Sequence, residues 1–170
     1  MLASLTTYLT FRRVALGVGA ACAAAVITAI GLQHLLGWEP CPLCIMQRLA
    51  LGATAIFALC AALTDRHFVA SYSFRSGASI AALGGCAAAI AQLRLLANPE
   101  QASCAPGIRL YLLKMTDVFP SLSWLLDGPA DCAADANLVL GLPLAFWTLA
   151  LLALCAAVLW LPWRERSTKP

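Results

Sequence analysis

The sequence predicts an all-α integral membrane protein, a four-helix bundle with one long external loop that contains a short interfacial helix. Hydrophobic residues make up 62% of the 170 residues and charged residues only 11%, and the mean hydropathy is +0.83. These values lie well outside the range of a soluble domain. The second observation is that the apolar residues gather into four long stretches.

Each apolar stretch has about 20 residues, which gives a helix of roughly 30 Å and matches the hydrocarbon core of a bilayer. We expect one membrane domain over residues 1–170. Its spans are 14–36, 45–63, 76–96 and 141–162, and its external loops are 37–44 and 97–140. The first stretch continues far past any small-residue cleavage site, so we expect a span there and not a signal peptide.

The basic residues flank these stretches unevenly. They gather near both ends of the chain and between the second and third stretches, as Arg12, Arg13, Arg66, Arg75, Arg164, Arg166 and Lys169. Because basic flanks remain in the cytoplasm, we expect both termini to be cytoplasmic. The loops 37–44 and 97–140 would then face the opposite compartment, where disulfides form and persist.

The eight cysteines divide into two groups by their position relative to the spans. One group lies inside the apolar stretches, where cysteine acts as a small packing residue: Cys22, Cys60, Cys86 and Cys155. The other group is external: Cys41, Cys44, Cys104 and Cys132. Four cysteines permit three pairings, of which the local C-x-x-C pair is the obvious one and leaves the two loop cysteines for each other. A purely structural disulfide in the loop is the alternative.

The C-x-x-C pair Cys41 and Cys44 stands where a loop meets the start of an apolar stretch. A helix N-terminus favours thiolates, and Arg48 lies one helical turn after Cys44 on the same face. The arrangement indicates redox activity, with Arg48 stabilising negative charge on a thiolate or on the group that accepts its electrons. Arg48 as an interfacial anchor and the cysteines as copper ligands with Met46 are the alternatives.

The long loop contains a middle segment that is too apolar for a free loop. It includes 110–113 and 118–126, with Lys114 and Asp117 between them. This pattern predicts a short helix in the membrane interface, which would hold Cys104 and Cys132 near the membrane surface. A loop packed on top of the bundle is the alternative.

Together these features resemble the disulfide bond formation protein B (DsbB) family of bacterial inner-membrane, quinone-linked thiol oxidases. The resemblance covers nearly the whole chain through the order and spacing of its motifs. The matching elements are Gln33-His34, Pro40-Cys41-x-Leu43-Cys44 with Arg48, Cys104-x-Pro106-Gly107 with Tyr111, Asp131-Cys132-Ala133, and Gly141-Leu142 with Trp147.

The resemblance implies a bound ubiquinone or menaquinone and a periplasmic thioredoxin-like partner, the dithiol oxidase DsbA, which is reoxidised. In the family mechanism the partner's thiolate attacks Cys104, and the freed Cys132 attacks Cys41. Cys44 is then left as a thiolate that faces the quinone. The expected partners are DsbA, membrane lipid and quinone. We expect no bound metal and no nucleic-acid partner.

Residues around the quinone are also implied by the resemblance. Arg48 would lie beside the ring, and Leu144 and Trp147 match positions that line the pocket. The chain departs from the family at the end of the third stretch, where members often carry an Arg-His pair and this chain offers only Gln92 and Arg94 as polar side chains. Residues 137–138 of this chain are Asn-Leu, whereas several family members have an aromatic residue at this place.

A vitamin K epoxide reductase-like quinone oxidoreductase is the remaining alternative, because it also combines a loop cysteine pair with a C-x-x-C in a helical bundle. In that class the C-x-x-C usually follows the loop pair along the chain. Here Cys41 and Cys44 precede Cys104 and Cys132, so the order favours the DsbB-like interpretation.

Overall fold

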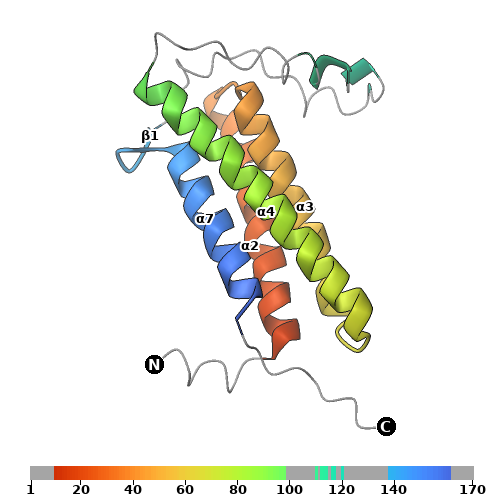
Figure 1. Ribbon diagram of the computed structural model, residues 1–170. Coiled ribbons are helices and arrows are strands. Elements are labelled where there is room, and N and C mark those ends of the chain that lie inside the picture. Colours follow the sequence, from red (N-terminus) through yellow and green to blue (C-terminus); the bar gives the residue numbers. More distant parts are fainter. Residues whose placement is uncertain are drawn as a thin grey trace.

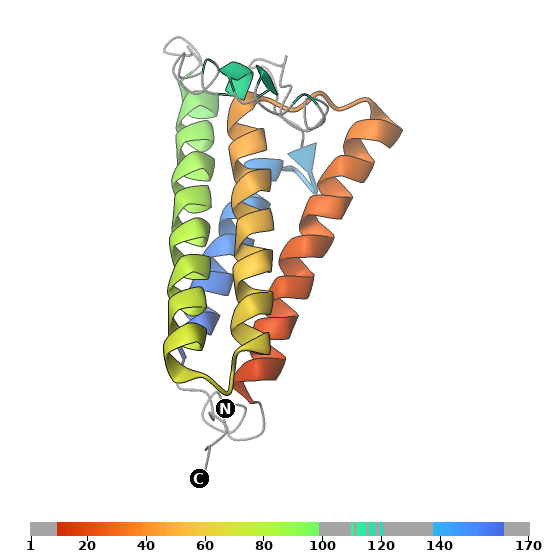
Figure 2. The same ribbon diagram turned by 90° about the vertical axis from the view of Figure 1, so that its right-hand side faces the viewer.

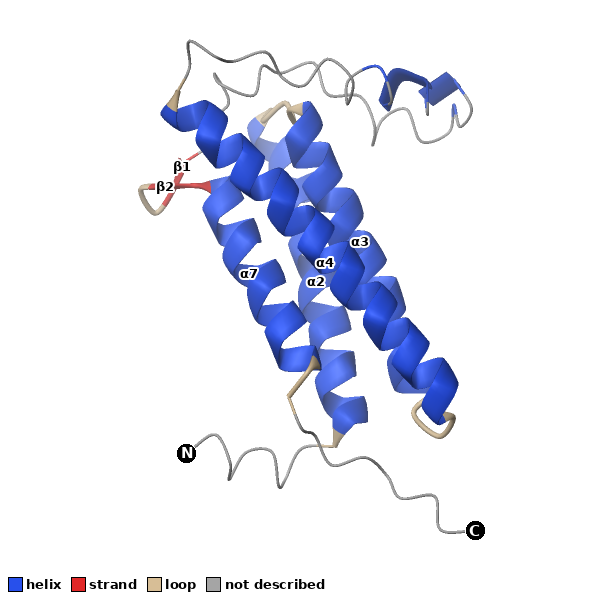
Figure 3. Cartoon of the chain, viewed as in Figure 1, coloured by secondary structure: helices blue, strands red, loops and turns tan. Residues whose placement is uncertain are grey.

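The computed structural model describes residues 10–98, 110, 112–114, 116–117, 120 and 138–161. Four long helices dominate this part of the chain (Figure 1, Figure 3). In chain order the elements are α2 (Phe11–Leu36), α3 (Pro42–Leu63), α4 (Phe68–Ala97), β1 (Leu138–Val139), β2 (Leu142–Pro143) and α7 (Leu144–Leu159).

The helices form one bundle in which α3 packs between α2 and α4, and α7 packs mainly against α4 (Figure 1). The start of α2, the turn between α3 and α4, and the end of α7 all lie at one end of the bundle (Figure 2). The start of α3 and the β1–β2 hairpin both lie toward the other end. At that end α2 leans away from α3 and α4.

Three helices are long and apolar enough to cross a membrane. They are α2, α3 and α4, with 26, 22 and 30 residues, and within each an 18-residue segment has a mean hydropathy of 2.1, 1.8 and 1.7 respectively. Helix α7 is apolar but has only 16 residues, or roughly 24 Å at 1.5 Å per residue. The prediction of a helical membrane protein is therefore confirmed, and α7 as a fourth span stays a prediction.

Large apolar side chains face outward on each of these helices. Ile27 on α2, Ile56 on α3 and Ile80 on α4 are 70%, 63% and 71% exposed, and Leu154 on α7 is 61% exposed. Such surfaces would be costly in water but suit contact with lipid chains. The exposed faces thus agree with the composition in indicating a bilayer environment.

At the end of the bundle that carries Cys41, the local sequence explains where the helices start and stop. Gly37, with φ 66°, ends α2 in the left-handed conformation that glycine adopts without strain. Pro42 occupies the first turn of α3, where its missing N–H costs nothing. The predicted span 141–162 begins later than expected, because Leu140 (φ 54°) and Gly141 (φ 80°) turn the chain into a hairpin before α7.

The inner faces of the helices carry small residues, which let the backbones approach closely. Gly85 on α4 is the tightest example. A methyl group at this position would lie 2.5 Å from Leu152 Cδ1 on α7 and 2.7 Å from Ala50 Cβ on α3. The close packing of α4 between α3 and α7 therefore depends on glycine at position 85.

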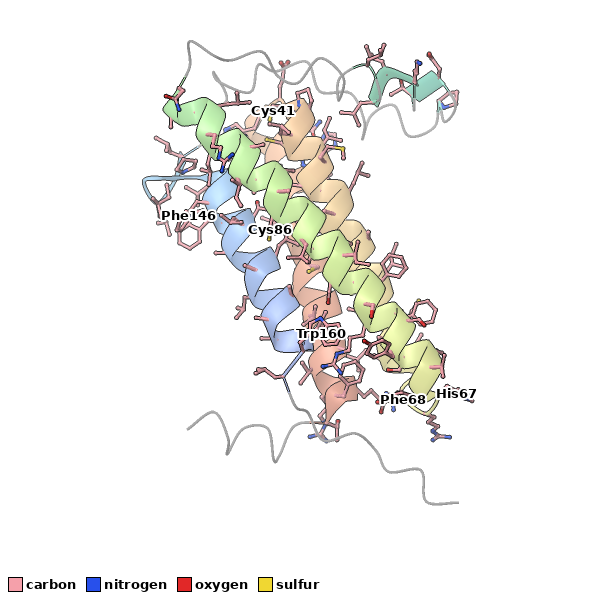
Figure 4. The ribbon with its side chains drawn as sticks, in the orientation of Figure 1. Cys41, His67, Phe68, Cys86, Phe146 and Trp160 are labelled. Carbon is pink, nitrogen blue, oxygen red and sulfur yellow. The ribbon has the colours of Figure 1, made fainter. Side chains whose placement is uncertain are left out.

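An arginine joins three helices at the end of the bundle opposite the C-x-x-C motif. The Arg75 guanidinium lies 5.1 Å from the ring centre of Phe11 and 4.8 Å from that of Trp160. Trp160, labelled in Figure 4, also donates a hydrogen bond of 2.7 Å from Nε1 to Ser79 Oγ. These contacts fix the relative positions of α2, α4 and the end of α7.

One described residue of the long loop packs directly on the bundle. Leu112 is 4% exposed and forms a small cluster with Ile45 and Met46 at the start of α3. Residues 110, 112–114 and 116–117 are helical, and Lys114 and Asp117 are exposed. The rest of the predicted interfacial helix lies outside the described residues, so its extent stays a prediction.

Candidate active site

Cys41 and Cys44 occupy the first turn of α3, with Cys41 as the N-cap residue. The Cys44 N–H donates to Cys41 Sγ at 3.3 Å, and the two sulfurs lie 2.8 Å apart. A disulfide needs a sulfur separation of roughly 2.05 Å, so only a small side-chain movement separates this pair from a bond. Cys41 is completely buried, whereas Cys44 is half-buried. Cys44 is therefore the sulfur with access to a reactant.

Two buried glutamines are linked to the Cys44 sulfur, Gln92 directly and Gln47 through Gln92. Gln92 on α4 donates from Nε2 to Cys44 Sγ at 3.2 Å, and its Oε1 accepts a 2.7 Å hydrogen bond from Gln47 Nε2. Both glutamines are only 3% exposed. An amide N–H directed at a sulfur stabilises the thiolate form, and Gln47 fixes the orientation of the Gln92 amide that does so.

Arg48 lies one turn below Cys44 and reaches across to α2. Its Nη1 donates to Gln33 Oε1 at 2.6 Å and its Nη2 to the carbonyl oxygen of Ala29 at 3.3 Å. The guanidinium is half-buried. These bonds hold a positive charge at a fixed position between α2 and α3, where the side chain is more constrained than that of a surface anchor.

A cavity of about 230 Å³ opens beside Cys44 and Arg48. Its walls come from α2, α3, the segment after α2, and α7, and they are mostly apolar. The lining residues are Ala25, Thr28, Ala29, Leu32, Trp38, Glu39, Pro40, Cys44, Gln47, Arg48, Leu51, Leu144, Ala145, Trp147, Thr148 and Leu151. An apolar cavity with one cation and one reactive sulfur suits a flat, lipophilic oxidant.

The β1–β2 hairpin positions the α7 side of this cavity. Trp147 donates from Nε1 to the carbonyl oxygen of Val139 at 3.1 Å, and its ring meets Phe146 edge to face. Leu144 is the first residue of α7. The structure therefore brings four of the residues singled out in the sequence, Cys44, Arg48, Leu144 and Trp147, to the lining of one cavity.

The loop cysteines Cys104 and Cys132 lie outside the described residues. Leu112, between them in the sequence, packs on Ile45, the residue after Cys44. One part of the loop therefore contacts the start of α3.

The glutamine pair around Cys44 was not assigned from the sequence. Gln92 stood out there only as a polar residue in an apolar stretch, and Gln47 was passed over. The available signal was their polarity, since buried amides in a membrane helix require partners.

As for a metal centre, residues 10–98 and 138–161 contain no group of three or more His, Cys, Asp and Glu side chains arranged to hold an ion.

Comparisons with known proteins show which sequences this chain is similar to. The profile of the family described as disulfide bond formation protein DsbB matches residues 11–162. Disulfide bond formation protein B of Chromobacterium violaceum is 36% identical over 152 residues, which cover 88% of this chain and 91% of the relative. The protein of the same name from Aromatoleum aromaticum is 35% identical over 146 residues, covering 85% and 87%. That from Acinetobacter baylyi is 37% identical over 133 residues, covering 76% and 77%. No solved structure matches.

Proposed function

Because this chain belongs to the disulfide bond formation protein B family and is a membrane protein of disulfide formation, we propose that it reoxidises periplasmic DsbA and delivers the electrons to a membrane quinone. The observation that carries the proposal is the shared cavity of Cys44 and Arg48. It combines a sulfur donor, a cation and apolar walls in one place.

The proposed electron path runs through two cysteine pairs. A DsbA thiolate attacks Cys104 and releases Cys132, and the second DsbA thiolate completes the DsbA disulfide, so the loop pair gains two electrons. Thiol–disulfide exchange then passes these electrons to Cys41 and Cys44, and the loop disulfide forms again. Each exchange breaks one sulfur–sulfur bond and forms another. The final acceptor must therefore take two electrons and two protons.

The cavity residues fit a quinone ring in size and in chemistry. A quinone, when bound, accepts electrons and protons at its two ring oxygens. Arg48 would hold a developing negative charge there, because its guanidinium is fixed by Gln33 and by the Ala29 carbonyl. The α7 wall, including Leu144 and Trp147, would exclude water from the ring.

Cys44 is the sulfur best suited to face the acceptor. It lines the cavity, whereas Cys41 is buried behind it. The Gln92 amide would stabilise the Cys44 thiolate in the interval after Cys41 has formed a mixed disulfide with the loop. Positively charged residues at the opposite end of the bundle support an orientation in which this site faces the periplasm and both termini face the cytoplasm.

The test is turnover by the purified full-length protein in detergent, with reduced DsbA as donor and ubiquinone or menaquinone as acceptor in parallel assays. We expect quinone reduction with one disulfide formed in DsbA per quinone consumed. Cys44→Ser should abolish turnover, and Cys60→Ser, away from the cavity, should retain it. Absence of turnover by the wild-type protein with both quinones would refute the proposal.

A further inference from the structure

A second pair of sulfurs lies deep in the bundle, one on α2 and the other on α7. Cys22 Sγ on α2 and Cys155 Sγ on α7 are 3.7 Å apart, although 133 residues separate them in the sequence. The two residues are 0% and 4% exposed. Figure 4 shows that Cys86, a neighbour in the same core, lies near the middle of the bundle, well below Cys41.

This pair lies directly below the cavity beside Cys44. Ala25 on α2 and Leu151 on α7 belong to the cavity lining. Cys22 precedes Ala25 by three residues, and Cys155 follows Leu151 by four, so each thiol is about one helical turn from a lining residue on its own helix. Both turns lead toward the opposite end of the bundle. The two sulfurs therefore lie between α2 and α7, just beyond the end of the cavity that is farther from the C-x-x-C motif.

The apolar surroundings of the two sulfurs limit the reactions that they can undergo. They belong to a core cluster rich in Ala, Leu and Val. A copper(I) ion held by the two thiolates would leave a net negative charge in this apolar medium, at a large cost in solvation free energy. Two thiols and a disulfide are both neutral. Oxidation to a disulfide is thus the change that this site tolerates.

The distances between the sulfurs also indicate which two cysteines would pair. Bond formation requires the sulfurs to move from 3.7 Å to roughly 2.05 Å, a distance that side-chain rotation and a small helix shift supply. The third buried thiol of this cluster, Cys86 on α4, instead lies 4.0 Å from the carbonyl oxygen of Leu149. Cys22 and Cys155 are therefore the expected pair.

We propose that Cys22 and Cys155 form a second, intramembrane dithiol that closes as a disulfide between α2 and α7 and narrows the cavity floor. The oxidant is a lipid-soluble quinone. The two thiols lose two electrons and two protons, one sulfur–sulfur bond forms, and the quinone becomes hydroquinone. A dithiol reductant returns the disulfide to two thiols by exchange and is itself oxidised to a disulfide. In naming quinone as oxidant and as occupant of the cavity, this inference rests on the function proposed above.

The consequence is a redox-dependent change in quinone use. Because α2 and α7 carry facing walls of the cavity, drawing them together below Ala25 and Leu151 changes its shape where a ring or its tail would extend. We expect the disulfide form to show a KM for quinone raised roughly fivefold, which corresponds to about 1 kcal/mol. The rate at saturating quinone should change little, since Cys44 and Arg48 keep their contacts.

The experiment uses the full-length protein in detergent, incubated either with a short-chain ubiquinone or with diamide, a thiol oxidant unrelated to quinones. Remaining thiols are then alkylated, and linked peptides are mapped by mass spectrometry. We expect a Cys22–Cys155 linkage in both arms and the raised KM after either treatment. Cys22→Ala and Cys155→Ala should turn over normally and lose the change in KM. Cys60→Ala is the matched control and should behave as wild type.

The outcomes separate this inference from the proposed function. Normal quinone turnover without a Cys22–Cys155 linkage in either arm would overturn the inference and leave the function standing. A linkage from Cys86 to either thiol in place of the expected one, or a linkage without a change in KM, would overturn it as well. A linkage with diamide alone, in a protein that never reduces quinone, would overturn quinone as the oxidant together with the proposed function.

Discussion

Replacing Gln92 with Leu should slow electron delivery from Cys44 while every cysteine and Arg48 stay in place. The substitution removes the 3.2 Å hydrogen bond from Gln92 Nε2 to the sulfur and the acceptor of the 2.7 Å bond from Gln47 Nε2. Hydrogen bonds to charged groups contribute about 1.5–3 kcal/mol. At 1.4 kcal/mol per decade, this predicts a rate lower by roughly 10- to 150-fold.

The same substitution should also destabilise the protein, because the Gln47 amide is left buried without its acceptor. That loss costs about 1–3 kcal/mol. A second variant, Gln47→Leu with Gln92→Leu, separates the two effects. Replacing both partners by apolar groups removes the unsatisfied amide, so stability should largely recover. The rate should not recover, because the Cys44 thiolate still lacks its donor.

The assay is single-turnover reduction of quinone by the prereduced protein, with thermal unfolding measured on the same samples. Arg94→Leu, two residues further along α4, is a control that leaves the glutamine pair untouched. Two results would refute the reasoning: a rate for Gln92→Leu within twofold of wild type, or recovery of the rate in the double variant. The first would mean that Gln92 only packs against the sulfur, and the second that the loss came from misfolding.

Three further predictions test other parts of the structure. Arg48→Ala should raise the KM for quinone by roughly 10- to 100-fold, since a charged hydrogen-bond donor is lost, and Arg48→Lys should fall between it and wild type; an unchanged KM together with an unchanged rate would leave Arg48 as an anchor only. Cys132→Ser leaves Cys104 without its loop partner, so under oxidising conditions DsbA should accumulate as a mixed disulfide on Cys104, visible on a non-reducing gel; a complex through another cysteine would break the proposed order. Gly85→Ala should destabilise the bundle by about 1–3 kcal/mol in thermal unfolding, because its methyl group meets two side chains at 2.5 and 2.7 Å, while Gly84→Ala, with nothing within 4 Å, should not; equal effects would contradict the packing described.

Local sequence determined the class of the protein and the ends of its helices. Composition alone required a membrane environment, because so apolar a chain has too few polar residues to cover a soluble surface. Gly37 and Pro42 set the end of α2 and the start of α3 through backbone geometry that does not depend on distant contacts. The same local rules placed Cys41 and Cys44 in one helical turn, with Arg48 below them.

The hairpin before α7 shows where local patterns were insufficient. Residues 141–143 continue an apolar stretch and were expected to be helical. The turn at Leu140 and Gly141 instead pairs β1 with β2, and Trp147 bonds to the hairpin through the Val139 carbonyl. Hydropathy reports only how apolar a segment is, and for a short apolar run it does not distinguish a strand from the first turn of a helix.

Only the tertiary structure decided which side chains meet across the bundle. The contacts of Gln92 with Cys44, of Arg48 with Gln33, and of Cys22 with Cys155 each join two helices that the sequence does not orient relative to each other. In a soluble helix the apolar stripe identifies the buried face. In these helices apolar residues cover both the lipid-facing and the inner faces, so rotation about the helix axis is fixed by the packing of small residues and by a few polar contacts. Those interactions exist only once the helices are assembled.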